Sequence, residues 1–250
     1  MKYAVTGSHG FIGTNLCKAI ERRGDQVVRV LHDREWPDML RVDALIHLGA
    51  YGTRPGQGDP KGYLKSLELT RQVVAQAEYQ DIPCVVAGSV VEEMPIASMY
   101  AATKLLSTTA AIDAGATVLR FTTPYGPHES PHRIVPQLIK CGRRGEYPHL
   151  SSLNFTRDFV YIDDVVEAIL KAVSEKPGVY RVASGTQLPL QYVVAQARLF
   201  FDLRSKPTWS GGNGRPWESP VSSVDPMLPG WSAKVRFPDG FVRTAEWAMR

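Results

Sequence analysis

Two side chains near the middle of the chain have the types and the spacing of a proton-transfer site. Tyr100 and Lys104 stand four residues apart in a segment with helical patterning, so their phenol and ammonium groups share one helix face. A nearby ammonium favours the phenolate, and we therefore expect Lys104 to lower the pKa of Tyr100. Tyr100 could then give a proton to a carbonyl oxygen or take one from an alcohol. The alternative is an ordinary surface tyrosine and lysine.

Ser89 is the third member of this candidate catalytic group. It closely follows the strand expected over residues 83–87, and groups at the carboxyl ends of parallel strands face the ligand crevice in doubly wound folds. There Ser89 would hydrogen-bond the reacting oxygen and orient it. A turn serine is the alternative, but the ordered set Ser89, Tyr100 and Lys104 is more specific than any one member.

A glycine-rich loop, Thr-Gly-Ser-His-Gly-Phe-Ile-Gly over residues 6–13, joins the first predicted strand to the first predicted helix. Gly7 permits a tight turn, Gly10 lets the backbone approach a pyrophosphate, and Gly13 lets helix and strand pack closely. The helix start adds free N–H groups and a positive dipole end. A turn without a ligand is the alternative to a dinucleotide site. The residues expected at the cofactor here are Gly7, His9, Gly10, Phe11, Ile12 and Gly13.

Short apolar runs alternate with helical stretches around these motifs. Strands between helices that are nearly continuous in apolar residues indicate a parallel sheet covered on both faces, and the alternation indicates a doubly wound α/β fold. The strands are expected over residues 3–6, 26–31, 43–48, 83–87 and 117–121, and the helices over 11–23, 63–79 and 99–114.

The second half of the chain has a different character. Residues 122–158 and 205–232 are rich in proline, and helical stretches lie between and beyond them. These segments therefore read as long loops shaped around a ligand rather than as linkers.

The glycine loop has the form TGxxGFIG, and further segments carry a known pattern along nearly the whole chain. Together they resemble the extended short-chain dehydrogenases/reductases, the NAD-dependent epimerase/dehydratase family that modifies nucleotide sugars. The segments are DALIHLGA at 43–50, RFTTPYGP at 120–127, RDFVYIDDV at 157–165, GVYRVASG at 178–185, and a tail with Gly230, Trp231, Phe241 and Trp247.

The resemblance implies a Rossmann-like core with a small C-terminal substrate-binding subdomain. We expect the core over residues 1–121 and 158–183 and the subdomain over 122–157 and 184–250. It also implies a homodimer that pairs the helices expected over 63–79 and 99–114, although the same side chains could pack on the sheet. The candidate dimer residues are Leu105, Leu106, Ala110 and Ala111, and further cofactor contacts are implied for Leu48, Gly49, Ala50, Tyr100, Lys104 and Pro124.

The chain departs from the family directly after the second strand. Only 11 residues lie between Leu31 and Asp43, too few for the usual helix, third strand and second helix. We therefore expect the outer strand of the sheet to be missing, together with the acidic pair that contacts adenine. His32 and Arg34 stand near the adenosine ribose and could meet a 2′-phosphate, which favours NADP over NAD. A solvated turn is the alternative.

The residues after Ser89 bear on the type of reaction. In the family's 4,6-dehydratases the active hydroxyl is followed by Asp-Glu, whereas here Val90 and Val91 follow, and Glu92 and Glu93 come too late. Hydride transfer at a carbinol carbon remains. The favoured reading is a reductase of a nucleotide-activated keto-sugar with exchangeable NADP or NAD. An epimerase with retained NAD and a non-catalytic dinucleotide-binding sensor are the alternatives.

The substrate side is less defined. Thr123 stands where the family often has a substrate-binding asparagine, and Ser66 replaces another asparagine. Arginine suits the substrate diphosphate because it pairs with phosphate bidentately. The expected substrate contacts are Ser89, Thr123, Arg157 and Arg215, whereas Arg143 and Arg144 are read as surface charges.

Composition excludes several classes of protein. The 250 residues carry 29 basic and 25 acidic side chains, a net charge of +4 without a concentrated basic run, so we expect no nucleic-acid partner. No stretch predicts a membrane span or signal peptide, and three scattered cysteines fit free thiols in the cytoplasm.

We expect no metal site: His128 and His132 lie in a proline-rich loop. The pair Asp163 and Asp164 is read as a helix N-cap.

Overall fold

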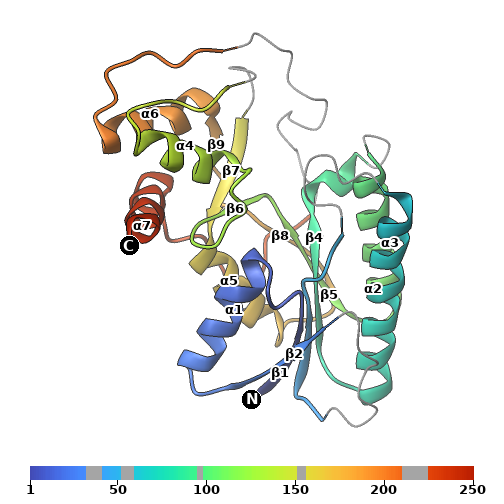
Figure 1. Ribbon diagram of the computed structural model, residues 1–250. Coiled ribbons are helices and arrows are strands. Elements are labelled where there is room, and N and C mark those ends of the chain that lie inside the picture. Colours follow the sequence, from blue (N-terminus) through green and yellow to red (C-terminus); the bar gives the residue numbers. More distant parts are fainter. Residues whose placement is uncertain (32–40, 52–58, 95–97, 151–155, 210–224) are drawn as a thin grey trace.

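Two β-sheets organise the chain, which the computed structural model describes over residues 1–31, 41–51, 59–94, 98–150, 156–209 and 225–250 (Figure 1). The larger sheet has six strands in the order β2-β1-β3-β4-β5-β8, and every pairing in it is parallel. The smaller sheet has the order β6-β7-β9. The expected parallel, doubly wound architecture is confirmed.

The strands of the larger sheet bury side chains on both faces. In β1, Ala4 belongs to one apolar cluster, whereas its neighbours Tyr3 and Val5 belong to the other. This alternation follows from the two-residue period of a strand. The six strands are β1 (Lys2–Thr6), β2 (Gln26–Val30), β3 (Ala44–His47), β4 (Cys84–Ser89), β5 (Thr117–Phe121) and β8 (Gly178–Val182).

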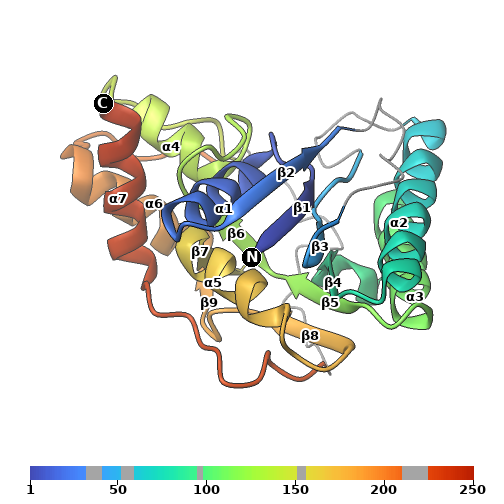
Figure 2. The same cartoon turned by 90° about the horizontal axis from the view of Figure 1, so that it is seen from below.

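Two pairs of helices cover the larger sheet (Figure 2). Helices α1 (Phe11–Arg22) and α5 (Ile162–Ala172) pack together on one face, and α2 (Pro60–Gln80) and α3 (Met99–Asp113) on the other. Helix α2 is longer than predicted. It begins where the Asp59 carboxylate accepts the Lys61 backbone N–H, with Pro60 in the first turn.

Strand β2 forms one edge of the larger sheet as described, as expected from the short connection after it. Its side chains are half-buried or exposed, whereas β3, two places further in, is buried throughout. The predicted loss of the outer strand is therefore consistent with the described sheet. Residues 32–40, with the predicted ribose contacts His32 and Arg34, lie outside the described residues.

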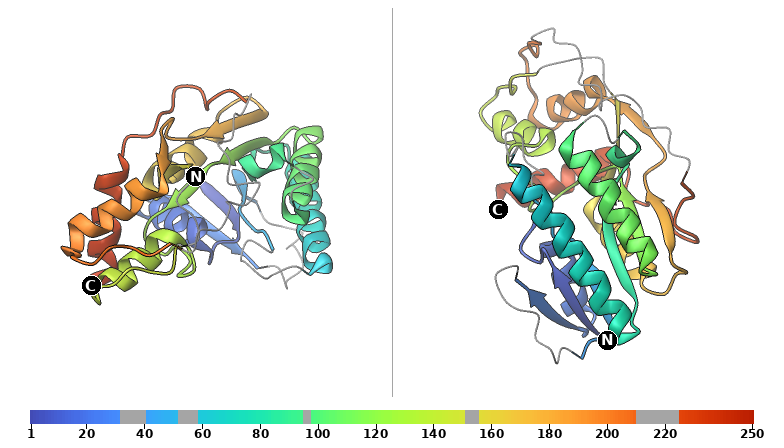
Figure 3. Two further views of the ribbon diagram at one scale, coloured as in Figure 1. Left: turned by 90° about the horizontal axis from the view of Figure 1, so that it is seen from above. Right: turned by 90° about the vertical axis from the view of Figure 1, so that its right-hand side faces the viewer.

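A second lobe lies beyond the carboxyl edge of the larger sheet, on the side opposite α2 and α3 (Figures 1 and 3). Its centre is aromatic: Tyr125 packs against Phe159, Tyr161 and Phe237. The predicted residue limits of the two subdomains stay a prediction. The lobe contains β6 (Thr123–Tyr125), β7 (Thr156–Tyr161), β9 (Gln187–Pro189), α4 (Ile134–Gly142), α6 (Leu190–Phe201) and α7 (Phe237–Met249).

All three cysteines are free thiols: Cys17 and Cys84 are buried and Cys141 is half-buried. Within the described residues, no helix combines the length and the apolar character that crossing a bilayer requires.

Candidate functional site

The glycine loop between β1 and α1 has the geometry that its sequence predicts. Gly7 adopts a positive φ of 64°, and a Cβ there would lie 2.7 Å from the backbone nitrogen of Gly49. A Cβ on Gly13 would lie 2.2 Å from the Gly7 carbonyl oxygen. The turn and the close approach of helix to loop therefore both require glycine.

The start of helix α1 fits a bound pyrophosphate. Gly10 is its N-cap, and among the described residues no side chain caps it and none in its first turn is acidic. The first N–H groups of a helix need partners, and its dipole favours an anion there. The loop and helix start thus suit the phosphates of a dinucleotide, as predicted for Gly7, His9, Gly10, Phe11, Ile12 and Gly13.

The end of β3 lies against this loop. Thr6 Oγ1 accepts the backbone N–H of Gly49 at 3.2 Å and lies 2.6 Å from His47 Nδ1. His47 Nε2 in turn lies 3.0 Å from Thr70 Oγ1 on α2. This buried chain brings Leu48, Gly49 and Ala50 to the carboxyl edge of the sheet beside the glycine loop. Ser66 replaces the family's asparagine and accepts the Tyr51 N–H at 2.7 Å.

Ser89, Tyr100 and Lys104 meet at the end of β4. Ser89 lies close enough to Tyr100 to lower the pKa of the phenol, and Lys104 Nζ donates to the Ala87 carbonyl at 2.7 Å. Tyr100 and Lys104 also line a small hollow with Gly49 and Ala50. The structure therefore brings together the three candidate catalytic residues and the second predicted cofactor segment.

The expected lowering of the Tyr100 pKa by Lys104 is wrong. Burial, with a smaller contribution from the nearby Glu92 carboxylate, raises the pKa of Tyr100 to about 12, against opposing effects of Arg133 and Ser89. Burial also lowers the pKa of Lys104. The Lys104 ammonium is held at the Ala87 carbonyl, and desolvation dominates. Tyr100 is therefore a neutral phenol at neutral pH.

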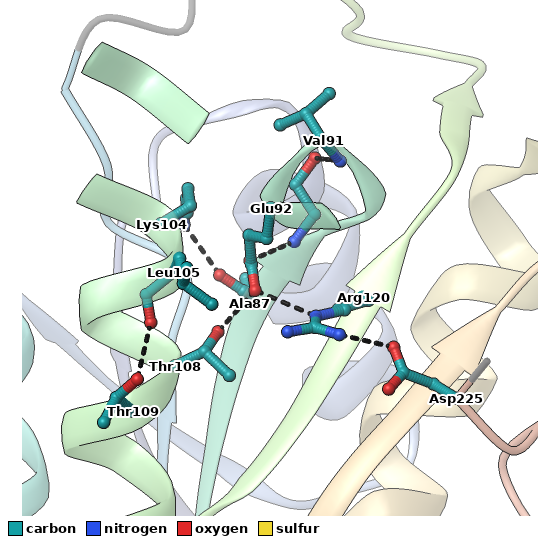
Figure 4. Close-up of polar contacts among 10 residues, drawn as sticks. Ala87, Val91, Glu92, Lys104, Leu105, Thr108, Thr109, Arg120 and Asp225 are labelled. Atoms are coloured by element: carbon teal, nitrogen blue, oxygen red, sulfur yellow. Dashed lines mark hydrogen bonds and ion pairs between the residues drawn. The ribbon is translucent and has the colours of Figure 1, made fainter. Parts of the chain in front are cut away.

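Glu92 is the centre of a polar network that includes the backbone N–H of Ser89 (Figure 4). Glu92 lies in the short 3₁₀ helix η1 (Val90–Glu93), and its Oε1 accepts the Ser89 backbone N–H at 2.6 Å. Its Oε2 accepts from Thr108 Oγ1 at 2.7 Å and from Arg120 Nε at 2.9 Å. Sequence reasoning set Glu92 aside as too late, although the pattern S-x-x-E is a recognisable capping box.

Arg120 extends this network to the C-terminal part of the chain. Its Nη1 donates to Asp225 Oδ2 at 2.6 Å, as Figure 4 shows. Beside Asp225, the Pro226 carbonyl accepts the Arg181 backbone N–H on β8. The segment that begins at Asp225 is thereby fastened to β8 at the edge of the larger sheet. This tie joins residues 105 positions apart in sequence.

The expected substrate contacts are spread over the smaller sheet. Thr123 is half-buried on β6, next to the expected cofactor contact Pro124, and Arg157 is half-buried on β7, opposite Leu188 of β9. Arg215 lies outside the described residues. Arg133, at the start of α4, was missed by sequence reasoning, yet its charge reaches Tyr100.

Three further sequence interpretations have structural outcomes. Asp163 and Asp164 are not N-caps, because Tyr161 occupies that position; they lie in the first turn of α5, and Asp164 Oδ2 accepts the Val235 N–H. His128 Nε2 lies 2.9 Å from Lys18 Nζ, and its ring packs on Trp247. His132 is exposed.

The parallel doubly wound sheet, with its glycine loop at the first strand–helix junction, defines a Rossmann-type dinucleotide-binding protein. Residues 3–183 match the model of the NAD dependent epimerase/dehydratase family, and the chain belongs to that family.

Known relatives resemble the chain at low identity. An uncharacterized protein of Methanocaldococcus jannaschii is 25% identical over 100% of this chain and 97% of its own length. The human dTDP-D-glucose 4,6-dehydratase is 28% identical, but over 52% of this chain and 40% of its own. A 2-alkyl-3-oxoalkanoate reductase of Stenotrophomonas maltophilia is 26% identical over 78% of this chain and 74% of its own.

Solved structures share the fold over the whole chain. MoeE5 in complex with UDP-glucuronic acid and NAD superposes with a TM-score of 0.84 at 23% identity, covering 100% of this chain and 99% of its own. The UDP-glucose 4-epimerase of Thermotoga maritima gives 0.84 at 18% identity with the same coverage. At these identities the likeness concerns the fold.

Proposed function

We propose that the protein is an NAD(P)-dependent reductase that reduces a keto group of a nucleotide-activated sugar. The observation that carries the proposal is the meeting of Tyr100 and Lys104 beside Gly49 and Ala50, with Ser89 close enough to Tyr100 to lower the pKa of its phenol. In this proposal all three are catalytic residues. When bound, the nicotinamide supplies the hydride at its C4 atom.

The protein side of the reaction follows from the state of each group. Tyr100, with a pKa raised by burial to about 12, holds its proton at neutral pH and can give it to the oxygen of a carbonyl as the alcohol forms. Ser89 donates to the same oxygen and fixes its position. Lys104 moves from the Ala87 carbonyl toward the cofactor ribose. A protonated phenol suits the reducing direction.

The Glu92 network supports this choice over dehydration. A dehydratase needs a carboxyl group free to move protons next to the active hydroxyl. Both Glu92 oxygens instead accept hydrogen bonds, from Ser89 N, Thr108 Oγ1 and Arg120 Nε. Glu92 is therefore a positioning residue in our proposal, and it leaves hydride transfer as the chemistry of the site.

The substrate class draws support from the family. The similar structures MoeE5 and the Thermotoga maritima epimerase are complexes with UDP-activated sugars or their acids. In this chain we assign the sugar to Ser89 and Thr123, and the diphosphate to Arg157 and Arg215. The cytoplasm, where the three free thiols stay reduced, is the proposed location.

An epimerase with tightly held NAD is the second candidate. Several structures that share the fold are sugar epimerases, and MoeE5 holds NAD. The short connection after β2 is expected to leave no room for the adenine-side strand that would retain the cofactor, which supports exchange in our proposal. The sequence preference for NADP rests on His32 and Arg34, so NADPH and NADH must both be tested.

The test begins with native mass spectrometry of the purified protein, followed by fluorescence titration with NADPH and NADH. Oxidation of either cofactor is then followed with UDP- and dTDP-activated 4-ketohexoses. We expect an empty protein, reversible binding and turnover. Stoichiometric retained NAD without reductase turnover would replace the proposal with the epimerase. Cofactor binding without turnover of any sugar, in wild type and Tyr100→Phe alike, would favour the sensor.

We also propose a homodimer through α2 and α3. Leu64 and Tyr79 on α2 and Leu106 on α3 are exposed, whereas Ala111 packs on the sheet. Of the predicted dimer residues, Leu106 is therefore exposed and available to a partner, whereas Ala111 is buried. Leu106→Glu, compared with Leu199→Glu at an exposed site on α6, should raise the dissociation constant in sedimentation; equal behaviour of the two variants would contradict the dimer.

A further inference from the structure

A second pocket lies outside the proposed catalytic group, between α4 and α7. It has a volume of about 440 Å³, within the range of small-molecule sites. None of Ser89, Tyr100 and Lys104 lines it. In Figure 1 its two helices lie on the left, whereas β4 and α3, which carry the candidate catalytic residues, lie on the right.

One end of this α4–α7 pocket carries a buried carboxyl group. The Glu129 side chain is 4% exposed, and its Oε1 lies 3.5 Å from Arg133 Nε. Its Oε2 is buried and has no hydrogen-bond partner among the described residues. An orphaned buried acceptor is costly to a folded protein. Because Glu129 lines the pocket, a molecule bound there can supply the missing donor.

The rim of the pocket is cationic. Lys140, Arg143 and Arg144 line it and have exposed side chains. Arg143 Nη1 donates to the Ala248 carbonyl at 3.2 Å, which places its guanidinium at the pocket and leaves further N–H groups for a ligand. Trp247, 40% exposed, adds an aromatic wall. Cations of this type, arginine above all, are common partners of phosphate.

We propose that the α4–α7 pocket binds a small organic phosphate whose other end carries a hydroxyl or amino donor. The phosphate meets Lys140, Arg143 and Arg144, the body of the molecule lies along Trp247, and the donor reaches Glu129 Oε2. Burial raises the pKa of Glu129 to about 7, and a carboxyl group can accept a hydrogen bond in either protonation state. Nucleoside monophosphates and sugar phosphates share this chemistry. The inference does not rest on the proposed function.

The test is calorimetric titration of the full chain with GMP, glucose 1-phosphate and inorganic phosphate. Glu129→Leu removes the acceptor, and Lys140→Glu reverses one rim charge. We expect Glu129→Leu to weaken GMP or glucose 1-phosphate at least tenfold while changing inorganic phosphate little. Lys140→Glu should weaken all phosphates that bind. Binding of GMP would indicate a nucleoside monophosphate as the ligand, and binding of glucose 1-phosphate would indicate a sugar phosphate.

Matched controls separate this pocket from the catalytic cleft and from general charge effects. Glu146→Leu and Lys65→Glu alter exposed residues outside the pocket and should change nothing. Thermal midpoints of all variants verify folding, and Glu129→Gln serves if the leucine variant does not fold. The proposal is overturned if neither organic probe binds, if the Glu129 variants bind them as wild type does, or if inorganic phosphate loses as much affinity as they do.

Discussion

Glu92 and Glu129 have buried side chains in opposite hydrogen-bonding states. Glu92 follows β4 in the chain. Its two carboxylate oxygens accept hydrogen bonds from three donors, and its side chain is fully buried. Glu129, in the α4–α7 pocket, has one oxygen near Arg133 and the other without a partner in the described chain. Both carboxyl groups are removed from water, yet only one is satisfied.

The difference separates two uses of a buried carboxylate. A saturated group holds its surroundings in one arrangement and has no capacity left for a ligand or a proton. An unsaturated group keeps that capacity, at a cost to stability. The Glu92 region should therefore respond to mutation through folding and catalytic geometry, and the Glu129 region through ligand and proton binding.

The largest expected effect is on catalysis alone. Tyr100→Phe removes the proposed proton donor, so turnover should fall roughly 10²–10⁴-fold. Binding of NADPH, NADH and the organic phosphates should not change, because the phenyl ring fills the same space. Steady-state rates and calorimetry on the same sample measure both. A comparable loss at the α4–α7 pocket would show that the two regions are not separate.

The next effect tests the saturated carboxylate. Glu92→Gln removes the buried anion that pairs with Arg120 Nε and the Ser89 N–H and leaves Arg120 with Asp225, which should cost about 3 kcal/mol of unfolding free energy. Urea unfolding measures it, with exposed Glu78→Gln on α2 as the control. A loss no larger than that of the control would mean that the network adds little to stability.

The unsaturated carboxyl should give the protein a pH-dependent stability. The pKa of Glu129 is raised from the ordinary 4.5 to about 7, so between these values the unfolded chain has lost a proton that the folded chain retains. Stability from this group therefore falls as pH rises from 4.5 to 7 and is level above. Urea unfolding of Glu129→Gln relative to wild type should show the variant gaining on the order of 3 kcal/mol across this window. A constant difference would indicate that Glu129 does not titrate there.

The smallest effect concerns the glycine loop. Gly13→Ala places a Cβ 2.2 Å from the Gly7 carbonyl oxygen and should cost about 1–3 kcal/mol through overpacking. It should also weaken dinucleotide binding. Gly178→Ala, whose nearest neighbour would be 3.4 Å away, is the control. Equal melting temperatures for the two variants would contradict the tight helix–loop contact.

The sequence was most informative where chemistry is local. The glycine loop, the parallel strands and the meeting of Ser89 with Tyr100 all follow from short motifs whose spacing determines their geometry. The edge position of β2 in the described sheet followed from counting the residues between Leu31 and Asp43. In each case the relevant contacts lie within one motif or between neighbouring parallel strands.

Longer-range electrostatics could not be predicted in the same way. The lowered pKa expected for Tyr100 depends on where Lys104 points and on how deeply the phenol is buried. Glu129 is one acidic residue in a proline-rich loop until α7 packs beside it. The Arg120–Asp225 pair joins strand β5 to a segment more than a hundred residues later. The preference for NADP and the role of Arg215 stay predictions.

The smaller sheet has a consequence for protein engineering. Its strands β6 and β7 precede β8 of the larger sheet and β9 follows it, so the chain returns to the larger sheet between β7 and β9. The second lobe is therefore not a cassette that can be cut out at one linker and exchanged for that of another enzyme. A chimera would need several junctions and would also have to preserve the Arg120–Asp225 tie. Redesign of this protein is better attempted by point substitution than by transplanting the lobe.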